Sequence, residues 1–286
     1  TVGATNDSTP TISGTSNAPA GTVITINVTD ADNTETFIAT VQADGSWSAD
    51  VPNALTDGPL TIEASVSDSA GNTTTLSEGA TLDTNAPSIN IDALMDTNDT
   101  TPNVSGTSSA ANGTIITVSF TDSNDITNTV QTTVTDGIWS VEAPVDLAEG
   151  SYEVEASVTD GSGNTSTATG SGIVDTTIPN IAVNDVTVTD DTTPTITGTA
   201  NAPQGSTVSV EITDSNNITH TVTTTLGVNG TWSVAATQVL AEGTFTVSAS
   251  VSDAAGNEAT ATGTGEIDTT APTLVLTSPG SSNDIP

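Results

Sequence analysis

Apolar residues alternate with Thr, Ser, Asn and Glu along most of the chain, which is the period-two pattern of strands that bury one face. Two sets of alternating apolar positions each occur three times. The first set is Ile24, Ile26 and Val28, then Ile116, Val118 and Phe120, then Val208, Val210 and Ile212. The second set is Leu60, Ile62, Ala64 and Val66, then Tyr152, Val154, Ala156 and Val158, then Phe245, Val247, Ala249 and Val251. The pattern predicts half-buried strands throughout and almost no helix.

Turn sequences separate these runs and repeat with the same period. Trp47, Trp139 and Trp232 each follow an Asp-Gly or Asn-Gly turn, at a spacing of 92 or 93 residues. A period of this length indicates tandem copies of one structural unit. In the second copy we predict strands near residues 88–92, 102–107, 114–122, 127–135, 138–143, 151–160 and 165–175. Seven short strands in about 92 residues are typical of an immunoglobulin-like sandwich.

The predicted fold class is therefore all-β, with tandem immunoglobulin-like β-sandwich domains of about seven strands each, arranged end to end. The boundaries are placed at a recurring joint sequence, residues 82–87, 174–179 and 267–272, in which a proline holds the backbone extended. Residues 1–84 are named repeat 1, which lacks its first strand; residues 85–176 are repeat 2, and residues 177–269 are repeat 3. Residues 270–286 are expected to be a linker and the start of a fourth copy, so the chain is expected to be part of a longer array.

The charge of the chain limits its partners. There are 35 acidic residues and no Lys or Arg, which gives a net charge of −35. Such a chain favours cations over nucleic acid or an anionic membrane surface. No run reaches the roughly 18 to 20 apolar residues of a membrane span, so we expect no membrane insertion by this segment. We also expect a monomer, because the negative charge opposes edge-to-edge pairing of sandwiches.

Four motifs in a fixed order carry a family resemblance: Asp-Gly-Xaa-Trp-Ser, Glu-Gly-Xaa-Phe-Thr-Val, Ser-Asp-Ala-Ala-Gly-Asn and Asp-Thr-Thr-Ala-Pro. Together they resemble the bacterial immunoglobulin-like extender repeats of large type-I-secreted RTX adhesins. In that family the repeats form a long stalk that calcium makes rigid and that projects a ligand-binding tip from the cell. The resemblance implies an extracellular place on the bacterial cell surface, a role in attachment or biofilm formation, and Ca²⁺ as the cofactor.

Candidate calcium ligands gather at the joints. In a seven-strand sandwich the last strand leaves at the end that carries the first and third connections, so Asp83 is expected near Asp7, Asp30 and Asp32. The next copy presents its leading end, which carries Asp136 and the loop of residues 160–164. Calcium takes six to eight oxygen ligands, which such loops can supply.

The predicted ligand sets fall into three groups, and neighbouring repeats are the expected partners. The joint sets are Asp83 with Asp160 and Asn164, and Asp175 with Asp253 and Asn257. The half sites are Asp68 and Asp268. The second tier pairs Asp7 with Asp30, Asp99 with Asp122, and Asp191 with Asp214. Turn capping is the alternative role for each residue, because Asp and Asn readily bond their own backbone.

Little in the sequence indicates catalysis. The chain has no Cys and one His, His220, in a predicted strand, whereas a hydrolase triad or a metal-hydrolase site needs such residues. We expect no enzymatic activity, and we expect the three Trp to be core anchors rather than carbohydrate platforms. The alternatives to a stalk are a module that binds glycan or a host surface, and spacer domains of a secreted polysaccharide-degrading enzyme. The close similarity of the three copies favours a spacer role over a binding module.

Overall fold

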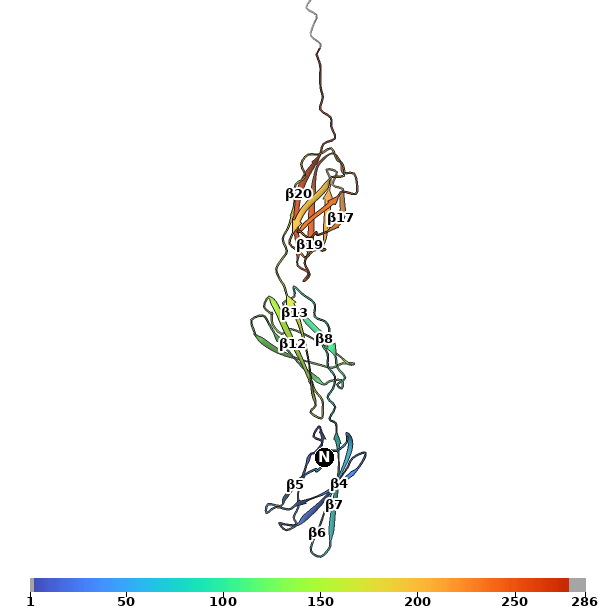
Figure 1. Cartoon of the computed structure of the whole chain (residues 1–286), viewed down its shortest axis with the longest axis vertical. Coiled ribbons are helices and arrows are strands. Elements are labelled where there is room, and N and C mark those ends of the chain that lie inside the picture. Colours follow the sequence, from blue (N-terminus) through green and yellow to red (C-terminus); the bar gives the residue numbers. More distant parts are fainter. Residues whose placement is uncertain (1–2, 278–286) are drawn as a thin grey trace, which may run out of the picture. The chain divides into compact units, whose positions relative to one another are not determined.

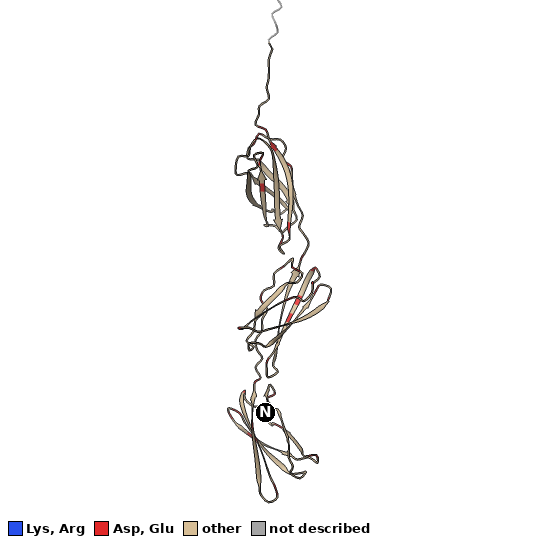
Figure 2. Cartoon of the chain, turned by 180° about the vertical axis from the view of Figure 1, so that it is seen from behind, with Lys and Arg blue, Asp and Glu red and all other residues tan. Residues whose placement is uncertain are grey.

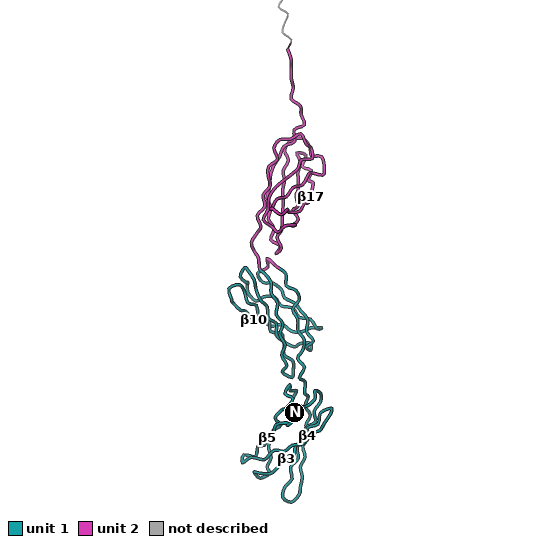
Figure 3. Tube along the Cα trace, viewed as in Figure 1, with its two compact units in different colours: residues 1–95, 100–173 teal, residues 96–99, 174–286 magenta. Residues whose placement is uncertain are grey.

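The computed structural model describes residues 3–277, and every regular element in this part of the chain is a strand (Figure 1). The predicted all-β class is therefore confirmed. The chain divides into two compact units, residues 1–95 with 100–173 and residues 96–99 with 174–286 (Figure 3). Among the described residues there is no helix long and apolar enough to cross a membrane.

Repeat 1 consists of a five-stranded sheet and a two-stranded sheet. Its strands are β1 (Ala4–Thr5), β2 (Thr11–Thr15), β3 (Val23–Thr29), β4 (Thr34–Thr40), β5 (Ser46–Asp50), β6 (Gly58–Ser67) and β7 (Thr73–Leu82). The larger sheet has the order β1-β7-β6-β3-β4, and β2 pairs with β5. Ile12 of β2 and Ile26 of β3 belong to one buried cluster, so the two sheets face each other across a common core.

Repeat 2 repeats this arrangement. Its strands are β8 (Asn103–Thr107), β9 (Ile115–Thr121), β10 (Thr127–Thr133), β11 (Ile138–Glu142), β12 (Gly150–Thr159) and β13 (Thr165–Val174). They form a sheet of order β10-β9-β12-β13 and the pair β11-β8. The prediction of a strand at residues 88–92 is only partly right. Asn90 and Asp92 donate to carbonyls of β8, at 3.0 and 2.9 Å, but these alternate bonds do not extend into a regular strand.

Repeat 3 contains the most complete first strand. Its strands are β14 (Ile181–Val183), β15 (Thr195–Ala200), β16 (Thr207–Thr213), β17 (Thr219–Thr225), β18 (Thr231–Ala235), β19 (Gly243–Ser252) and β20 (Glu258–Ile267). The sheets have the orders β14-β15-β18 and β17-β16-β19-β20. β14 pairs with β15 and contributes Ile181 to the core, so it closes one edge of the sandwich.

The alternating positions predicted to be buried form these cores. Every member of the first set is at most 2% exposed, and in repeats 2 and 3 the second set is equally well buried. In repeat 1, however, Ala64 and Val66 are only half-buried. Burial of this kind on one face of each strand supplies most of the favourable free energy of folding in a sandwich without disulfides.

Each Trp packs across a glycine of the neighbouring strand. Trp232 lies opposite Gly198, where an added Cβ would come within 2.3 Å of the Trp ring and 2.1 Å of the carbonyl oxygen of Ala182. No side chain fits such a space, so this position requires glycine. Trp139 and Trp232 are 2% exposed, which confirms that they are core anchors, whereas Trp47 is only half-buried.

Candidate functional site

Asp160 builds the loop of residues 160–164 that follows β12. Its Oδ1 accepts backbone hydrogen bonds from Ser162 and Asn164, both at 2.9 Å, and its Oδ2 accepts one from Asn164 Nδ2 at 3.0 Å. Gly163 has a φ of +97°, a left-handed conformation that favours glycine. The hydrogen bond from the Asn164 side chain, followed by those from the backbone, lowers the pKa of Asp160. Asp160 therefore caps this turn through both of its carboxylate oxygens.

Asn164 connects this loop to the linker that follows β7. Its Nδ2 donates to the backbone carbonyl oxygen of Asp83 at 2.7 Å, across 81 residues of sequence, and the side chain is only 8% exposed. The N–H of Asp83 is fixed in turn by the carbonyl of Thr5, at 3.0 Å. The fold thus brings Asp83, Asp160 and Asn164 together. The Asp83 atom that takes part is its carbonyl oxygen, while its Oδ1 accepts a hydrogen bond from the N–H of Asn85.

The same arrangement recurs in the second unit. Asn257 Nδ2 donates to the carbonyl oxygen of Asp175 at 2.7 Å and to Asp253 Oδ2 at 2.9 Å, and Asn257 is 7% exposed. Burial opposes ionisation of Asp253, but the hydrogen bonds from Asn257 outweigh it, so the pKa of Asp253 is lowered. We call these two arrangements the asparagine latches: Asn164 with Asp160 and the Asp83 carbonyl, and Asn257 with Asp253 and the Asp175 carbonyl.

The side chains of the two predicted half sites take part in local hydrogen bonds, and the backbone N–H of Asp268 also donates to the carbonyl of Thr189 at 2.9 Å. In repeat 1, Asn72 Nδ2 donates to Asp68 Oδ2 at 2.7 Å, which reproduces the loop half of a latch. Asp268, which follows β20, accepts a hydrogen bond from the N–H of Thr270 at 3.0 Å, as Asp83 does from Asn85. Each half site therefore has the local geometry of one side of a latch.

Three of the second-tier residues, Asp30, Asp122 and Asp214, cap hairpin turns. Asp122 Oδ1 accepts N–H donors from Asn124 and Ile126 at 2.9 and 3.0 Å, and its Oδ2 faces the N–H of Ala148 at 3.4 Å. The bond from Ile126 has the largest effect in lowering the pKa of Asp122. Asp30 and Asp214 accept equivalent backbone bonds, and their pKa values are lowered by Thr56 and Ile218 first. Both oxygens of each carboxylate are thus engaged by backbone donors.

The other second-tier residues, Asp7, Asp99 and Asp191, lie at the turns that lead into β2, β8 and β15. Each backbone N–H donates to the Thr hydroxyl two residues earlier, at 3.1 Å. Asp7 and Asp191 also accept the N–H of the Thr two residues later, both at 2.9 Å. These hydrogen bonds are local and stabilise the turn in which each residue lies. They do not involve Asp30, Asp122 or Asp214, the predicted partners of these residues.

Two carboxylates that sequence reasoning missed hold the linkers. Asp57 accepts hydrogen bonds from the N–H and the hydroxyl of Thr84, at 3.1 and 3.0 Å. Glu242 accepts the hydroxyls of Thr269 and Thr270, and these bonds lower its pKa, that from Thr269 most. The signal in the sequence was the acidic residue before the glycine that begins β6 and β19, which indicates a turn but not a contact with a distant linker.

No Lys or Arg side chain pairs with any of these carboxylates, because the chain has neither residue, as the absence of blue in Figure 2 shows. Among residues 3–277, no three side chains of His, Cys, Asp or Glu gather closely enough to hold a metal ion. A cation at a latch therefore needs backbone carbonyl and amide oxygens as ligands in addition to carboxylates.

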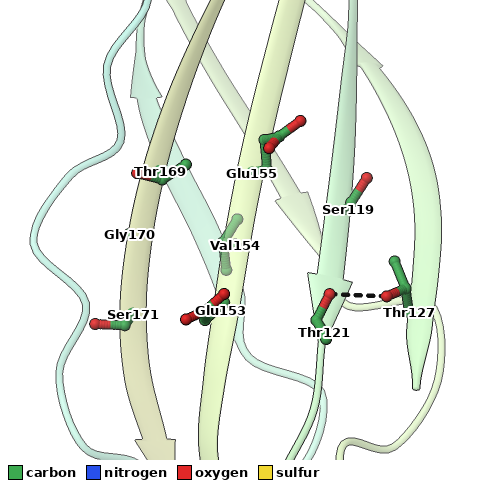
Figure 4. Close-up of a pocket in the computed structure, with 9 residues that line it drawn as sticks. All are labelled: Ser119, Thr121, Thr127, Glu153, Val154, Glu155, Thr169, Gly170 and Ser171. Carbon is green, nitrogen blue, oxygen red and sulfur yellow. Dashed lines mark hydrogen bonds between the residues drawn. The ribbon is translucent and has the colours of Figure 1, made fainter. Parts of the chain in front are cut away.

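A polar hollow of about 560 Å³ lies on the outward face of repeat 2 (Figure 4). Glu153 and Glu155 face it from β12, while Val154 points to the other side of the sheet. The hydroxyls of Thr121 and Thr127 bond each other at its edge, at 2.9 Å. No aromatic side chain lines the hollow, so it lacks the stacking surface typical of carbohydrate sites.

Three solved structures are similar to the chain. One is a tetra-tandem repeat in the extending region of a large adhesion protein, with 32% identity and a TM-score of 0.35, over 93% of this chain and 72% of that one. Another concerns the host cell surface retention of a 1.5-MDa bacterial ice-binding adhesin, with 24% identity and a TM-score of 0.36, over 91% of each chain. The third is a Ca²⁺-stabilized adhesin that helps an Antarctic bacterium bind ice, with 29% identity and a TM-score of 0.37, over 93% of this chain and 70% of that one.

Comparison with curated proteins gave no match. The model of the bacterial Ig-like domain family matches residues 2–84, 91–176 and 182–269. These three segments follow one another and cover most of the chain, and each spans one sandwich, the third beginning within β14. The chain therefore belongs to the bacterial Ig-like domain family.

Proposed function

We propose that this chain is a stalk segment of a bacterial surface adhesin, in which calcium at the joints between repeats provides stiffness and the stalk projects a distal binding domain for attachment or biofilm formation. Membership of the bacterial Ig-like family and the 32% identity to repeats from the extending region of a large adhesion protein support this role. Both point to a structural, non-enzymatic part of an extracellular protein. The observation that carries the proposal is the recurrence of the asparagine latch at two linkers.

The latch limits the freedom of a linker. A backbone carbonyl that is held by a nearly buried side chain cannot turn without losing its hydrogen bond, which contributes about 1 kcal/mol to stability. In the first unit the linker is also held by Asp57 and by the carbonyl of Thr5. In the second unit the N–H of Asn98 donates to the carbonyl of Ala255, inside the latch loop, at 3.1 Å. Several weak bonds at one joint add to its stiffness.

The latch residues also fit a calcium ion. Asn164 Nδ2 lies 2.7 Å from the Asp83 carbonyl oxygen and 3.0 Å from Asp160 Oδ2. A half-turn of this amide would exchange its nitrogen and oxygen, and the Asn164 amide oxygen would then join the Asp83 carbonyl and the Asp160 carboxylate as three of the six to eight oxygen ligands that calcium takes. Calcium would neutralise carboxylates that have no cationic side chain nearby. The residues that would hold it are Asp83, Asp160 and Asn164, and in the second unit Asp175, Asp253 and Asn257.

Solution scattering of the full chain tests the proposal. Calcium is expected to increase the maximum dimension and the melting temperature relative to the same protein in chelator, because metal binding stabilises the folded state by mass action and stiffens the joints. If both quantities are the same in calcium and in chelator, the calcium part of the proposal is wrong.

A matched pair of variants separates the latch from the metal. Asn257→Asp replaces the donor to the Asp175 carbonyl by a carboxylate, so the joint loosens in chelator. Calcium, for which the amide oxygen is replaced by a negatively charged ligand, restores the stiffness. Asn72→Asp makes the same change in the loop of repeat 1, where Asn72 bonds Asp68 but no linker carbonyl. This control should leave the maximum dimension unchanged both in calcium and in chelator. Equal behaviour of the two variants would contradict the role of Asn257.

A further inference from the structure

The chain contains two Asn-Gly sequences, Asn112-Gly113 and Asn229-Gly230, and a Thr follows each of them. This dipeptide is chemically labile. Because Gly has no side chain and a mobile backbone, its nitrogen can reach the side-chain carbonyl carbon of the Asn and close a succinimide ring. Water then opens the ring to aspartate or to isoaspartate, in which the backbone runs through the side chain. Since the two local sequences match, a difference in lability between them has to come from the fold.

The fold protects Asn112 at both ends of its amide. Asn112 Oδ1 accepts the N–H of Asp136 at 2.9 Å, and Asn112 Nδ2 donates to Asp136 Oδ1 at 3.3 Å. The N–H of Gly113, whose nitrogen would be the nucleophile, donates to the carbonyl of Val134 at 2.8 Å. Ring closure at Asn112 therefore breaks hydrogen bonds at the amide and at the nucleophile.

Asn229 is held much less firmly. It lies in the turn between β17 and β18, and its side chain is exposed. Within the part of the chain that the structure describes, no hydrogen bond holds this side chain. The N–H of Gly230 donates to the carbonyl of Gly227 at 3.1 Å, inside the same turn. Exposed turns open locally at a small cost in free energy, so the Gly230 nitrogen becomes available without the unfolding of a strand.

The corresponding turn of repeat 1 already contains an aspartate. In residues 42–46 and 227–231 the N–H of the first residue donates to the carbonyl of the last, at 2.8 and 2.9 Å, and the N–H of the fourth donates to the carbonyl of the first, at 3.0 and 3.1 Å. Asp44 occupies the position of Asn229, and its Oδ1 accepts the N–H and the hydroxyl of Ser46, at 3.0 and 2.7 Å. These bonds, that from the hydroxyl most, lower the pKa of Asp44. The turn thus holds a carboxylate at this position.

The same turn disfavours isoaspartate. An aspartate at position 229 can accept the N–H and the hydroxyl of Thr231, the counterpart of Ser46. Isoaspartate lengthens the backbone by one atom just before Gly230, whose carbonyl accepts the N–H of Ala200 at 2.8 Å. Gly230 has a φ of +68°, and even an added Cβ there would lie 2.6 Å from the Ala200 carbonyl oxygen. A longer backbone cannot keep all the bonds of so tight a turn.

We propose that Asn229 deamidates spontaneously in the folded protein and that aspartate is the main product, whereas Asn112 is preserved. The Gly230 nitrogen loses its proton and bonds to Cγ of Asn229, the bond from Cγ to Nδ2 breaks, and the amide group leaves with a proton as ammonia. Water then adds at Cγ and the ring bond to the Gly230 nitrogen breaks, which restores the N–H and leaves a carboxyl group. The product adds one negative charge to a chain of net charge −35 and gives repeat 3 the Asp-Gly turn of repeat 1. The reaction does not depend on calcium or on a role as a stalk.

Ageing of the full chain at mildly alkaline pH tests the proposal, with mass spectrometry of peptic peptides to follow each amide as it becomes a carboxylate. In the folded chain Asn229 should convert about tenfold or more faster than Asn112, because fewer hydrogen bonds have to break. In concentrated urea the two should convert at nearly the same rate, since Gly-Thr follows both. Equal rates in the folded chain would overturn the role of the fold. A folded chain that keeps Asn229 intact, while the unfolded chain loses it, would overturn the proposal itself.

The product is identified with an isoaspartate-specific methyltransferase. The isoaspartate share at position 229 should be smaller after ageing of the folded chain than after ageing in urea, because the turn accepts aspartate only. Asn229→Asp should unfold at the same denaturant concentration as the parent or a higher one. An equal isoaspartate share in both samples, or a lower unfolding midpoint of this variant, would overturn the assignment of the product.

A pair of glutamine variants controls for other sources of deamidation. Asn229→Gln should abolish conversion at this position, because the longer side chain does not close the same ring. Asn112→Gln should leave the rate at Asn229 as in the parent, since Asn112 lies in another repeat. Circular dichroism checks that both variants are folded. A carboxylate that forms equally fast in Asn229→Gln would show that the reaction does not pass through the Gly230 nitrogen.

Discussion

The side-chain amide of Asn257 donates to the backbone carbonyl of Asp175 at 2.7 Å, across 82 residues of sequence, and Asn164 stands in the same relation to Asp83. Side-chain to backbone bonds between residues so far apart fix a linker more directly than a surface charge pair does, because they are nearly buried and depend little on salt. Because the same contact occurs in both units, it is a recurring feature of the repeat and not a property of a single loop.

Removing the latch amide should loosen the joint without unfolding a repeat. Asn257→Ala leaves the Asp175 carbonyl and Asp253 Oδ2 without this donor, at a cost of about 1 kcal/mol. Hydrogen exchange of residues 175–179 should become faster, while exchange in β19 stays as in the parent. Asn72→Ala, which removes an amide that bonds Asp68, is the control, and it should leave residues 175–179 unaffected.

Filling the space at the Trp should destabilise a repeat. Gly198→Ala places a Cβ 2.3 Å from the Trp232 ring and 2.1 Å from the Ala182 carbonyl oxygen, so the strand or the ring must shift, at a cost of about 3 kcal/mol. Gly79→Ala is a matched control in β7, because its Cβ would meet only the carbonyl oxygen of Leu60, at 3.8 Å. Denaturant unfolding followed by Trp fluorescence distinguishes them, and equal midpoints would show that the glycine is not needed for packing.

Acid should destabilise the sandwiches through the turn-capping carboxylates. Hydrogen bonds lower the pKa of Asp122 from its ordinary value of 3.8, so in the folded state this carboxyl binds a proton only at lower pH than in the unfolded chain. The resulting stabilisation is fully present above pH 3.8 and is lost as the pH falls through the folded pKa. Melting temperature should therefore fall steeply below about pH 4.

Asp122→Asn provides the comparison for this pH dependence. The variant is expected to melt at a lower temperature at neutral pH, because an amide nitrogen would face the N–H of Ala148. It should also lose less stability on acidification than the parent does. Parallel melting curves for parent and variant between pH 6 and pH 2 would argue that Asp122 does not contribute.

The linker carboxylate at the end of repeat 3 should act locally. Glu242→Ala removes the acceptor of the Thr269 and Thr270 hydroxyls, which lie just after β20. Hydrogen exchange at residues 268–270 is expected to accelerate, with the melting temperature of the chain almost unchanged. A large drop in melting temperature would mean that Glu242 supports the sandwich itself and not only the linker.

Most of the strands could be predicted because their signals are local. Alternating burial and Asp-Gly turns are read within a few residues, and strands such as β9 and β12 match the predicted ranges closely. The structure of residues 88–92 was harder to predict, because the hydrogen bonds of this segment to β8 depend on where β8 lies in the fold. The lesser burial of Val66 also could not be read locally, because burial depends on which segments pack against the strand.

Pairs of core residues illustrate the same limit. Phe245 lies opposite Gly265, where a Cβ would come within 2.2 Å of the Phe ring, while the smaller Leu60 of repeat 1 lies opposite Ala80. The sequence shows both substitutions but does not show that they compensate each other. Only the register of the strands makes this relation visible.

The sequence by itself determined the repeat, the strand faces and the grouping of Asp83, Asp160 and Asn164 at one joint, because these follow from periodicity and from the order of strands in a sandwich. Only the tertiary structure decided which atoms meet there. Asn164 reaches the carbonyl oxygen of Asp83 rather than its carboxylate, and Asp57, absent from the predicted sites, holds the residue that follows Asp83. The reason is physical: hydrogen bonds are directional over about 3 Å, and positions at that scale are set by the packing of whole strands and loops.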